Sequence, residues 1–264
     1  MLVSTLVALS IAPVSAQLAA PNDAGVAWGH IHMNVTDVEL HERIWVEHFG
    51  GVKVDLDLVA TIRLPNTIIM LNERVPTGGT RGSAVDHLGF SVPDLDAFLE
   101  RWRAEGFAVE SEFEDFGGLP QAFVTFPDDI RVELQEIPTL DVPAEPYHVH
   151  LYTGNGAEQQ RDWYASRFSM SPRRRGSIPY TADVPGMNVS FNDAEGTPAP
   201  TRGRAVDHIG FEVLNLEAYV EMLEARGVVF QVPYRVIEEI GAGIAFFTDP
   251  SGVFVELTEG LPGG

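Results

Sequence analysis

The feature that most restricts the fold of this chain is an internal repeat. Residues 80–110 and residues 201–231 align without a gap at an offset of 121, and 15 of the 31 aligned positions are identical. The two copies contain the phrases AVDHLGFSVPDLDAF and AVDHIGFEVLNLEAY. A period of this size is far longer than the roughly 20–50 residues of a solenoid repeat. The chain is therefore an internal duplication of a domain-sized unit.

Each copy carries the same order of secondary-structure signals. The alternating run VDHLGFSV predicts a strand, and PDLDAFLERWRAEG, which ends at Gly106, predicts an amphipathic helix. The rest of each copy holds β-type runs around a polar turn, such as the DPSG sequence of residues 249–252. Each copy therefore predicts a βαβββ module.

A weaker module precedes each strong one. Residues 28–51 and residues 145–168 again show a strand pattern followed by a helix pattern, and NTIIMLNE and GMNVSFND supply their last strands. The modules begin near residues 27, 84, 146 and 205. The sequence thus predicts an α+β fold in which four βαβββ modules pair into two open β cups.

The module starts also predict the domain boundaries. Residues 26–138 hold modules 1 and 2, and residues 146–260 hold modules 3 and 4. The intervening residues 139–145 contain proline and predict a linker. Modules are expected to pair inside each domain, and pairing of module 1 with module 4 and of module 2 with module 3 is the alternative.

The first 20 residues are apolar and uncharged, and small residues precede Gln17, which predicts a signal peptide over residues 1–20. The protein is then exported to the periplasm or secreted, and it is cytoplasmic if this segment is not a leader. The apolar run is too short, and broken too early by Pro13, for a transmembrane helix.

Composition excludes several classes of function. The net charge of −21, from 38 acidic and 17 basic residues, argues against nucleic acid or an anionic membrane as a partner. The chain has no cysteine, which excludes thiol catalysis, disulfides and cysteine-bound zinc. A small molecule is the expected partner, and the sequence predicts no particular oligomeric state.

One position of the first strand is a histidine in all four modules. It lies seven residues before the residue that starts the helix, and its four occurrences are His30, His87, His148 and His208. A single histidine on a strand is usually packed in the core or solvated. Four histidines at one register indicate a shared role.

The last strand supplies a partner for these histidines in two modules. Glu133 in RVEL and Glu256 in FVEL are carboxylates flanked by valine and leucine. An inward carboxylate is costly unless it is paired or bound to a cation. The same register holds Met70 in module 1 and Ser190 in module 3, and neither is a typical metal ligand.

Two imidazoles and one carboxylate leave three positions of an octahedral ion open. Pairing inside each domain predicts one set of His30, His87 and Glu133 and another of His148, His208 and Glu256. The alternative pairing regroups these residues and still gives each cup two histidines and one glutamate. A divalent metal ion is therefore the expected cofactor.

Modules 1 and 3 carry a second histidine two residues later, His32 and His150. Residues i and i+2 of a strand share a face, so both side chains should point into a cup. Acid–base catalysis or a substrate contact, a fourth metal ligand, simple packing, and a register in which they replace His30 and His148 all remain open.

Other polar residues are expected to reach the substrate or the solvent. Arg131 lies two residues before Glu133 and is predicted to neutralise that carboxylate or to bind an anionic substrate. Tyr152 is predicted to contact substrate as a phenolic donor. Three further features are predicted to be solvated: His41, His48 and the basic run 173–175.

The DHxGFxV strand, the FTDPSGxxVEL ending and the paired βαβββ plan resemble the vicinal oxygen chelate superfamily over residues 27–260. That superfamily includes glyoxalase I, extradiol dioxygenases, fosfomycin-resistance enzymes and methylmalonyl-CoA epimerase. The resemblance implies metal ligands on the first and last strands, which carries over to the six residues of the two predicted sets. It implies a divalent Fe, Mn, Zn, Ni or Mg ion.

Three functions follow from this resemblance. The first is a metal-dependent lyase or isomerase of the glyoxalase type, in which His32 or His150 moves a proton. The second is an Fe(II) dioxygenase of the extradiol type, which the absence of any histidine after His208 disfavours. The third is a metal-free binding protein of the bleomycin-resistance type, which two complete ligand sets disfavour. Met70 and Ser190 depart from the four-ligand site of bacterial-type glyoxalase I.

Overall fold

A computed structural model of the chain describes residues 17–54, 59–115 and 117–261. Most of the predicted signal peptide, residues 1–16, lies outside the described residues, so export stays a prediction. No helix in the described ranges is long and apolar enough to span a membrane.

Each of the four predicted modules is a strand, a helix and three further strands. Module 1 consists of β1 (Val26–Val35), α1 (Val38–Glu47), β2 (Val52–Val54), β3 (Ala60–Leu64) and β4 (Thr67–Glu73). Module 2 consists of β5 (Val85–Val92), α2 (Leu95–Ala104), β6 (Ala108–Glu114), β7 (Pro120–Phe126) and β8 (Ile130–Glu136), with a short 3₁₀ turn (Pro127–Asp129) before β8.

The second half of the chain repeats this order. Module 3 consists of β9 (Glu145–Thr153), α3 (Ala157–Phe168), β10 (Ser171–Arg175), β11 (Ile178–Val184) and β12 (Met187–Asp193). Module 4 consists of β13 (Val206–Val213), α4 (Leu216–Ala225), β14 (Phe230–Ile237), β15 (Ala242–Thr248) and β16 (Phe254–Glu259). The α+β fold of four βαβββ modules is confirmed.

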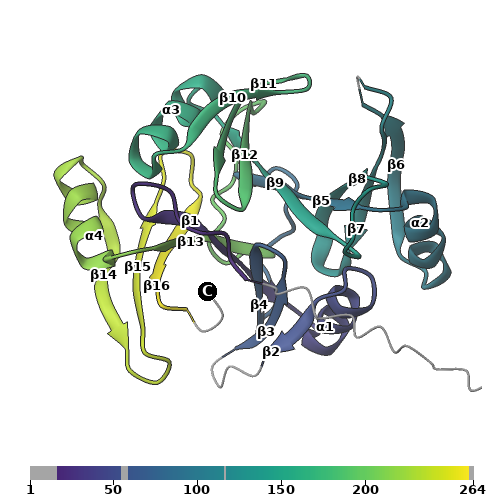
Figure 1. Ribbon diagram of the computed structural model, residues 1–264, viewed down its shortest axis with the longest axis horizontal. Helices are drawn as coiled ribbons and strands as arrows, with labels where there is room; N and C mark the ends of the chain where they lie inside the picture. Colours follow the sequence, from purple (N-terminus) through teal and green to yellow (C-terminus); the bar gives the residue numbers. More distant parts are fainter. Residues whose placement is uncertain (1–16, 55–58, 116, 262–264) are drawn as a thin grey trace, which may run out of the picture.

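The modules pair across the two halves of the chain. One eight-stranded sheet has the order β14-β15-β16-β13-β1-β4-β3-β2, and the other has the order β10-β11-β12-β9-β5-β8-β7-β6. In Figure 1, β1 and β13 cross the middle of the first sheet, and β5 and β9 lie side by side in the second. We call the two sheets cup 1–4 and cup 2–3 after the modules that form them.

The expected pairing of modules inside residues 26–138 and inside residues 146–260 is therefore wrong, and the alternative pairing is found. In both cups the first strands of two modules pair antiparallel, β1 with β13 and β5 with β9. All four modules present the same kind of strand edge, so the repeat pattern by itself cannot select the partner. The domain boundaries as stretches of sequence stay predictions.

Aromatic packing nevertheless joins the modules within each half. Trp45 of α1 contacts Phe90 and Phe126 of module 2, with ring centroids 5.4 and 4.9 Å apart. Phe168 of α3 stacks on Phe211 of module 4 at 4.6 Å. Burial of each such side chain stabilises the fold by about 1.5–3 kcal/mol. Each half of the chain thus has an aromatic core that its two modules share. The two sheets connect one half to the other.

His41 and His48 of α1 are buried and not solvated, with 0% and 3% of their surface exposed. They share the buried helix face with Ile44 and Trp45, at the helical spacing of three and four residues. His41 Nε2 lies 3.1 Å from Asp128 Oδ2, and His48 Nε2 lies 2.8 Å from Glu105 Oε1. Both histidines therefore link module 1 to module 2.

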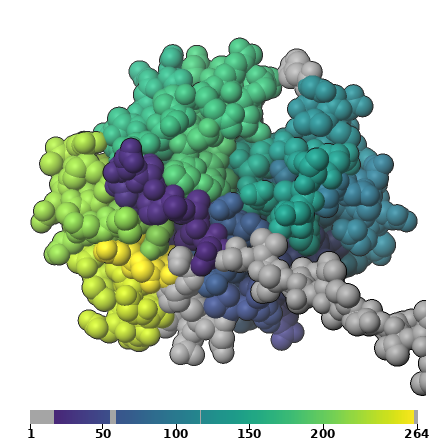
Figure 2. All heavy atoms as spheres, viewed as in Figure 1, coloured from purple at the N-terminus to yellow at the C-terminus, as the bar shows by residue number. Residues whose placement is uncertain are grey.

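The stretch before β1 packs on module 3. Asn22 Nδ2 donates to the carbonyl of Phe168 over 3.0 Å, and Trp28 N donates to the carbonyl of Pro185 over 2.9 Å. In Figure 2, this purple stretch lies against the green atoms of module 3. Module 1 is therefore in contact with module 3 as well as with its sheet partner.

The DPSG turn is held by Asp249, a buried carboxylate that accepts hydrogen bonds from four donors. Its Oδ1 accepts from the backbone N–H groups of Ser251 and Val253, each at 2.8 Å. Its Oδ2 accepts from Gln160 Nε2 at 2.7 Å and from Tyr164 Oη at 2.8 Å, both on α3. Asp249 therefore connects the turn of module 4 to the helix of module 3.

We predict that Asp249→Ala destabilises the fold by about 3 kcal/mol, because it leaves four buried donors without their acceptor. The midpoint of urea unfolding measures the loss. Asp162→Ala, which removes an exposed carboxylate from α3, is the matched control and should change stability by less than about 0.5 kcal/mol. Equal midpoints for the two variants would contradict the role of Asp249.

Candidate metal centres

The strand pairing places the four histidines of the repeat at one register. Across β1 and β13, His30 lies opposite Gly210 and His32 lies opposite His208. Across β5 and β9, Gly89 lies opposite His148 and His87 lies opposite His150. In each cup, therefore, one module supplies a histidine followed by glycine at i+2, and the other supplies two histidines at i and i+2.

The glycines of the DHxG phrases make room for the partner imidazole. A Cβ atom added to Gly89 would lie 2.1 Å from Nδ1 of His148, and a Cβ atom added to Gly210 would lie 2.0 Å from Cε1 of His30. Real Cβ contacts are never this short. Glycine thus lets an imidazole from the second module lie across the strand of the first.

The last strands confirm the register of the two glutamates. Glu256 on β16 lies beside Gly210, and Glu133 on β8 lies beside Gly89. The symmetric positions beside the second histidines hold Met70 on β4 and Ser190 on β12. Each cup therefore has one carboxylate and one side chain that is a poor ligand, as the sequence predicts.

In cup 1–4, two imidazoles meet one carboxylate oxygen. Nε2 of His30 and Nε2 of His208 each lie 2.9 Å from Oε2 of Glu256. The three side chains are buried, and their ligand atoms all lie within 4.8 Å of one another. His30 and Glu256 are 226 residues apart in the sequence.

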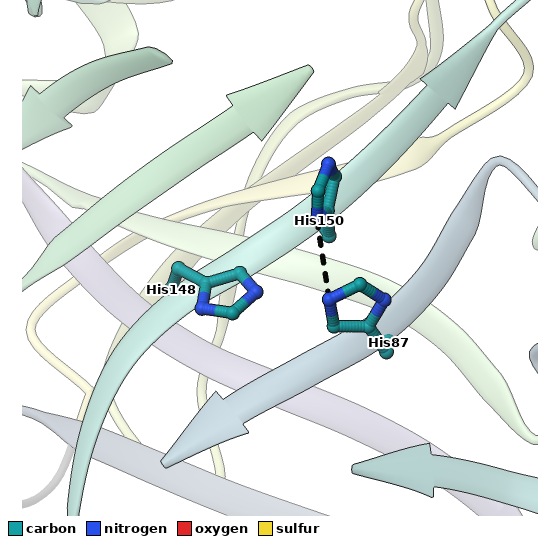
Figure 3. Close-up of side chains that lie close together, drawn as sticks. All are labelled: His87, His148 and His150. Atoms are coloured by element: carbon teal, nitrogen blue, oxygen red, sulfur yellow. Dashed lines mark hydrogen bonds between the residues drawn. The ribbon is translucent and has the colours of Figure 1, made fainter. Parts of the chain in front are cut away.

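In cup 2–3, three imidazoles surround one carboxylate. Nε2 of His87 lies 2.9 Å from Oε2 of Glu133, and Nε2 of His148 lies 3.4 Å from the same oxygen. Nδ1 of His150 lies 3.1 Å from Nε2 of His87. Figure 3 shows His148 and His150 extending from one strand towards His87 on the neighbouring strand.

The predicted grouping of these residues needs correction, because it followed the wrong module pairing. His30 and His87 do not share a cup with Glu133, and His148 and His208 do not share a cup with Glu256. The cups hold His30, His208 and Glu256, and His87, His148 and Glu133. Each cup still receives two histidines and one glutamate.

The hydrogen bonds of His208 and His87 determine which nitrogen of each ring carries the proton. Nδ1 of His208 lies 2.7 Å from the carboxylate of Asp207, and Nδ1 of His87 lies 2.8 Å from that of Asp86. A carboxylate only accepts hydrogen bonds, so each Nδ1 carries the proton. In a neutral imidazole, Nε2 then directs a lone pair at the glutamate oxygen 2.9 Å away.

Two facing lone pairs require a cation between them, either a proton or a metal ion. Burial alone would lower the pKa of His208, but its contacts with Asp207 and Glu256 outweigh burial and raise that pKa to about 9. The pKa of Glu256 is lowered despite its burial, through its interactions with His30 and His208. Both shifts show that the cluster favours a bound positive charge.

The distances also fit metal ligands. Ligand bonds to a divalent transition metal are about 2.1 Å long, so two ligands at right angles lie about 3 Å apart. The nitrogen–oxygen separations of 2.9 Å in cup 1–4 and of 2.9 and 3.4 Å in cup 2–3 match this value. The residues of both cups therefore fit a divalent ion. In cup 2–3 the ligand atoms that all lie within 4.8 Å of one another are those of His87, His148 and His150, and Glu133 lies beside His87 and His148.

His150 and His32 differ from the other histidines in that neither forms an ion pair with a carboxylate of the described residues. Burial, the charge of His87 and the charge of Arg175 lower the pKa of His150 well below its usual value. Burial and the two neighbouring histidines lower the pKa of His32 to about 3. Both rings are therefore neutral at physiological pH and available as ligands or as proton acceptors.

Cup 2–3 opens into a cavity of about 600 Å³ whose wall combines polar and apolar side chains. Arg131 and Tyr152 lie on this wall together with Glu133, and their contact with substrate stays a prediction. The guanidinium of Arg131 is paired with Asp86 at 2.9 Å and with Glu110 at 3.0 Å. Arg131 therefore positions Asp86, and through it the ring of His87.

Cup 1–4 has a different interior. Beside His32, His208 and Glu256 it has an apolar cavity of about 190 Å³, whose wall includes Met70, Ile244 and Phe246. Its outer opening is polar and includes Arg74 and Arg202. The two cups thus present similar ligand sets to different surroundings.

The sequence does not identify every residue of these sites. Arg175, expected in solvent, lies on the wall of the cup 2–3 cavity together with Tyr147. Asp86 and Asp207, which fix the tautomers of His87 and His208, are repeated in the two VDH phrases, and that repetition is the signal that could have revealed them. No pattern in the sequence singles out Arg175 from its two neighbours.

The fold of this chain is similar to that of several solved structures. Glyoxalase I from Zea mays matches with a TM-score of 0.72 at 18% identity, over 89% of this chain and 92% of that chain. The chain has the vicinal oxygen chelate fold. A putative dioxygenase from Bacillus subtilis matches with a TM-score of 0.68 at 13% identity, over 94% of this chain and 87% of that chain. No family model and no curated protein matches the sequence.

We predict that Gly89→Ala and Gly210→Ala each abolish metal binding in one cup of this vicinal oxygen chelate fold. The added methyl group would displace the ring of His148 or of His30, and misplaced ligands lower metal affinity by about 10–100-fold or more. Metal analysis after loading should find two ions in the original protein and one in each variant.

Each glycine variant is the control for the other, because both carry the same chemical change in opposite cups. The Gly89→Ala variant should keep the ion of cup 1–4, and the Gly210→Ala variant should keep that of cup 2–3. Two ions in either variant would show that the displaced histidine is not a ligand.

Proposed function

We propose that the protein is a divalent-metal-dependent lyase or isomerase whose active site is cup 2–3. The observation that carries this proposal is the convergence of His87, His148 and Glu133, of which His87 and Glu133 line a cavity of about 600 Å³. This volume suits a small-molecule substrate. The fold shared with glyoxalase I from Zea mays is consistent with such an enzyme and does not identify its reaction.

The ligand set leaves room for substrate. Two imidazoles and one carboxylate occupy three positions of an octahedral ion, so two adjacent oxygens of a substrate can take two of the rest. A divalent ion held there would polarise these oxygens and stabilise the negative charge that develops when a neighbouring C–H proton is removed. The two oxygens must be vicinal to reach adjacent positions.

His150 is placed to move the proton. Its ring is neutral, and its Nε2 is buried and forms no hydrogen bond with the described residues. The ring lies 4.6 Å from that of His87, centroid to centroid, so a substrate bound at the ligand set would lie next to it. We propose that His150 takes a proton from one carbon and returns it to the neighbouring position.

Tyr147 adds a donor to the same site. Burial and the charge of Glu133 raise the pKa of the Tyr147 hydroxyl well above its usual value, so the group stays protonated. Its oxygen is buried and lies close enough to Glu133 for each group to shift the pKa of the other. A substrate oxygen beside Glu133 would therefore find a neutral donor there.

Cup 2–3 is a better candidate than cup 1–4 because it holds more groups that can react with or orient a substrate. Besides its ligand set it contains His150, Tyr147, Tyr152 and Arg175 around one cavity. The cavity next to Glu256 is smaller, about 190 Å³, and has an apolar wall. Chemistry that moves protons needs the polar groups of cup 2–3.

The second candidate function is an Fe(II) dioxygenase of the extradiol type. The observation that favours it is the same set of two imidazoles and one carboxylate, which is the donor set of many non-haem Fe(II) oxygenases. The lack of a histidine after His208 counts less in the structure than in the sequence, because His150 brings a third imidazole into cup 2–3 from module 3.

We predict that Glu133→Gln lowers kcat/KM by at least about 100-fold and removes one of two bound ions, because the amide is a far weaker ligand than the carboxylate. The measurement is turnover of small α-hydroxy- and α-oxo-carbonyl compounds by protein loaded with Mn, Fe(II), Zn, Ni or Mg. Glu158→Gln, on the exposed surface of α3, is the control and should retain both properties.

The same preparations separate the candidate functions. Oxygen uptake with catechols by the Fe(II)-loaded protein alone would replace the lyase or isomerase by the dioxygenase. Failure of the loaded protein to retain any ion would leave a metal-free binding protein. A Glu133→Gln variant with full turnover and full metal content would overturn the assignment to cup 2–3.

A further inference from the structure

Arg175 is a cation of cup 2–3 that the chemistry described so far does not use. It is the last residue of β10, at the start of the β10–β11 turn in module 3. Its neighbours Arg173 and Arg174 are exposed, as the sequence predicts, whereas Arg175 is half-buried on the wall of the cavity. Its guanidinium carbon lies 4.9 Å from the centre of the Tyr147 ring, which fixes the side chain inside the cup.

The position of Arg175 is defined by Ser190. Nη2 of Arg175 lies 3.4 Å from Oγ of Ser190, which is fully buried. Ser190 on β12 pairs with His150, and Glu133 on β8 pairs with Gly89, so the two residues occupy equivalent positions in modules 3 and 2. We call the position of Ser190 the fourth corner of the ligand set, because a glutamate there would be a fourth ligand. At this corner, cup 2–3 has a guanidinium in place of a carboxylate.

Arg175 makes no direct ion pair with a described carboxylate, although its charge lowers the pKa of Glu133 at longer range. Among the residues that the structure describes, it has no ion-pair partner within 4.0 Å, and its buried Nε forms no hydrogen bond. Arg131, the other arginine of this wall, pairs with Asp86 and Glu110 at 2.9 and 3.0 Å. A partly buried guanidinium is costly unless an anion pairs with it.

At the corresponding corner of cup 1–4, the residues that the structure describes carry no such charge. Met70 takes the place of Ser190, and the wall around it is apolar, with Ile244 and Phe246. The requirement for an anion is therefore specific to cup 2–3, and it does not follow from the fold that the two cups share.

We propose that the substrate of cup 2–3 carries a carboxylate on the carbon next to its metal-binding oxygen, as α-oxo and α-hydroxy acids do. One oxygen of this carboxylate pairs with Arg175 beside Ser190. The other carboxylate oxygen and the neighbouring oxygen are the vicinal pair that faces His87, His148 and Glu133. The substrate thus supplies the negative charge that Ser190 does not. This inference rests on the proposed function of cup 2–3 and names its substrate class.

The test measures binding of oxalate and oxamide to the full-length protein by calorimetry, with and without Mn²⁺. Oxalate has two vicinal carboxylates, and oxamide is its neutral analogue of nearly the same shape. Arg175→Gln should weaken oxalate binding by about 10–100-fold, because it removes a charge-assisted hydrogen-bonded pair. It should weaken oxamide binding by less than about threefold, because oxamide carries no charge. Arg175→Lys should recover part of the oxalate affinity, because it restores the charge without the planar fork.

Arg174→Gln is the matched control, since it removes the same charge from an exposed position one residue away, and it should leave oxalate binding unchanged. Equal oxalate affinities for the Arg175→Gln variant and the original protein would overturn the inference. A Glu133→Gln variant with full metal content would overturn the proposed metal site instead. In that case the metal-free titrations still report whether Arg175 binds the anion.

Discussion

The interaction on which both cups depend is the approach of imidazole nitrogens to a single carboxylate oxygen. Nε2 of His87 and Nε2 of His208 each lie 2.9 Å from a glutamate oxygen, and an aspartate on the other side of each ring fixes which nitrogen carries the proton. The approach is unfavourable without a cation and favourable with one. This approach explains most of the repeated VDHxG motif. The aspartate orients the histidine ring, and the glycine leaves space for the imidazole of the second module.

The same requirement is met by pairing of modules across the two halves of the chain. A cup needs an antiparallel contact between two first strands, and this contact joins β1 to β13 and β5 to β9. The ligand set of cup 1–4 therefore draws on both ends of the described chain. Because aromatic packing joins module 1 to module 2 and module 3 to module 4, each module is held by one neighbour through its strand and by another through its helix.

Sequence reasoning succeeded where a strict period determined the answer. The two-residue period of the strands and the fixed distance to the helix start placed His30, His148, Glu133 and Glu256 at the correct register. It failed where the outcome depends on contacts between distant segments. Module pairing depends on which strand edges meet, and the direction of Arg175 depends on the Tyr147 ring beneath it. The burial of His41 and His48 was readable, since they share the helical spacing of Ile44 and Trp45.

The two cups differ at one position of the ligand set, Met70 in cup 1–4 and Ser190 in cup 2–3. This position can differ because three ligands are enough to hold an ion. Two imidazoles and one carboxylate suffice, so the fourth corner is free to change without loss of the metal. In cup 1–4 that corner is Met70 in an apolar wall, and in cup 2–3 it is Ser190 beside Arg175. A polar or anionic ligand is disfavoured at the first corner, because the apolar side chains described there do not compensate its lost hydration, and it is favoured at the second. The two cups therefore place similar ligand sets in chemically different surroundings.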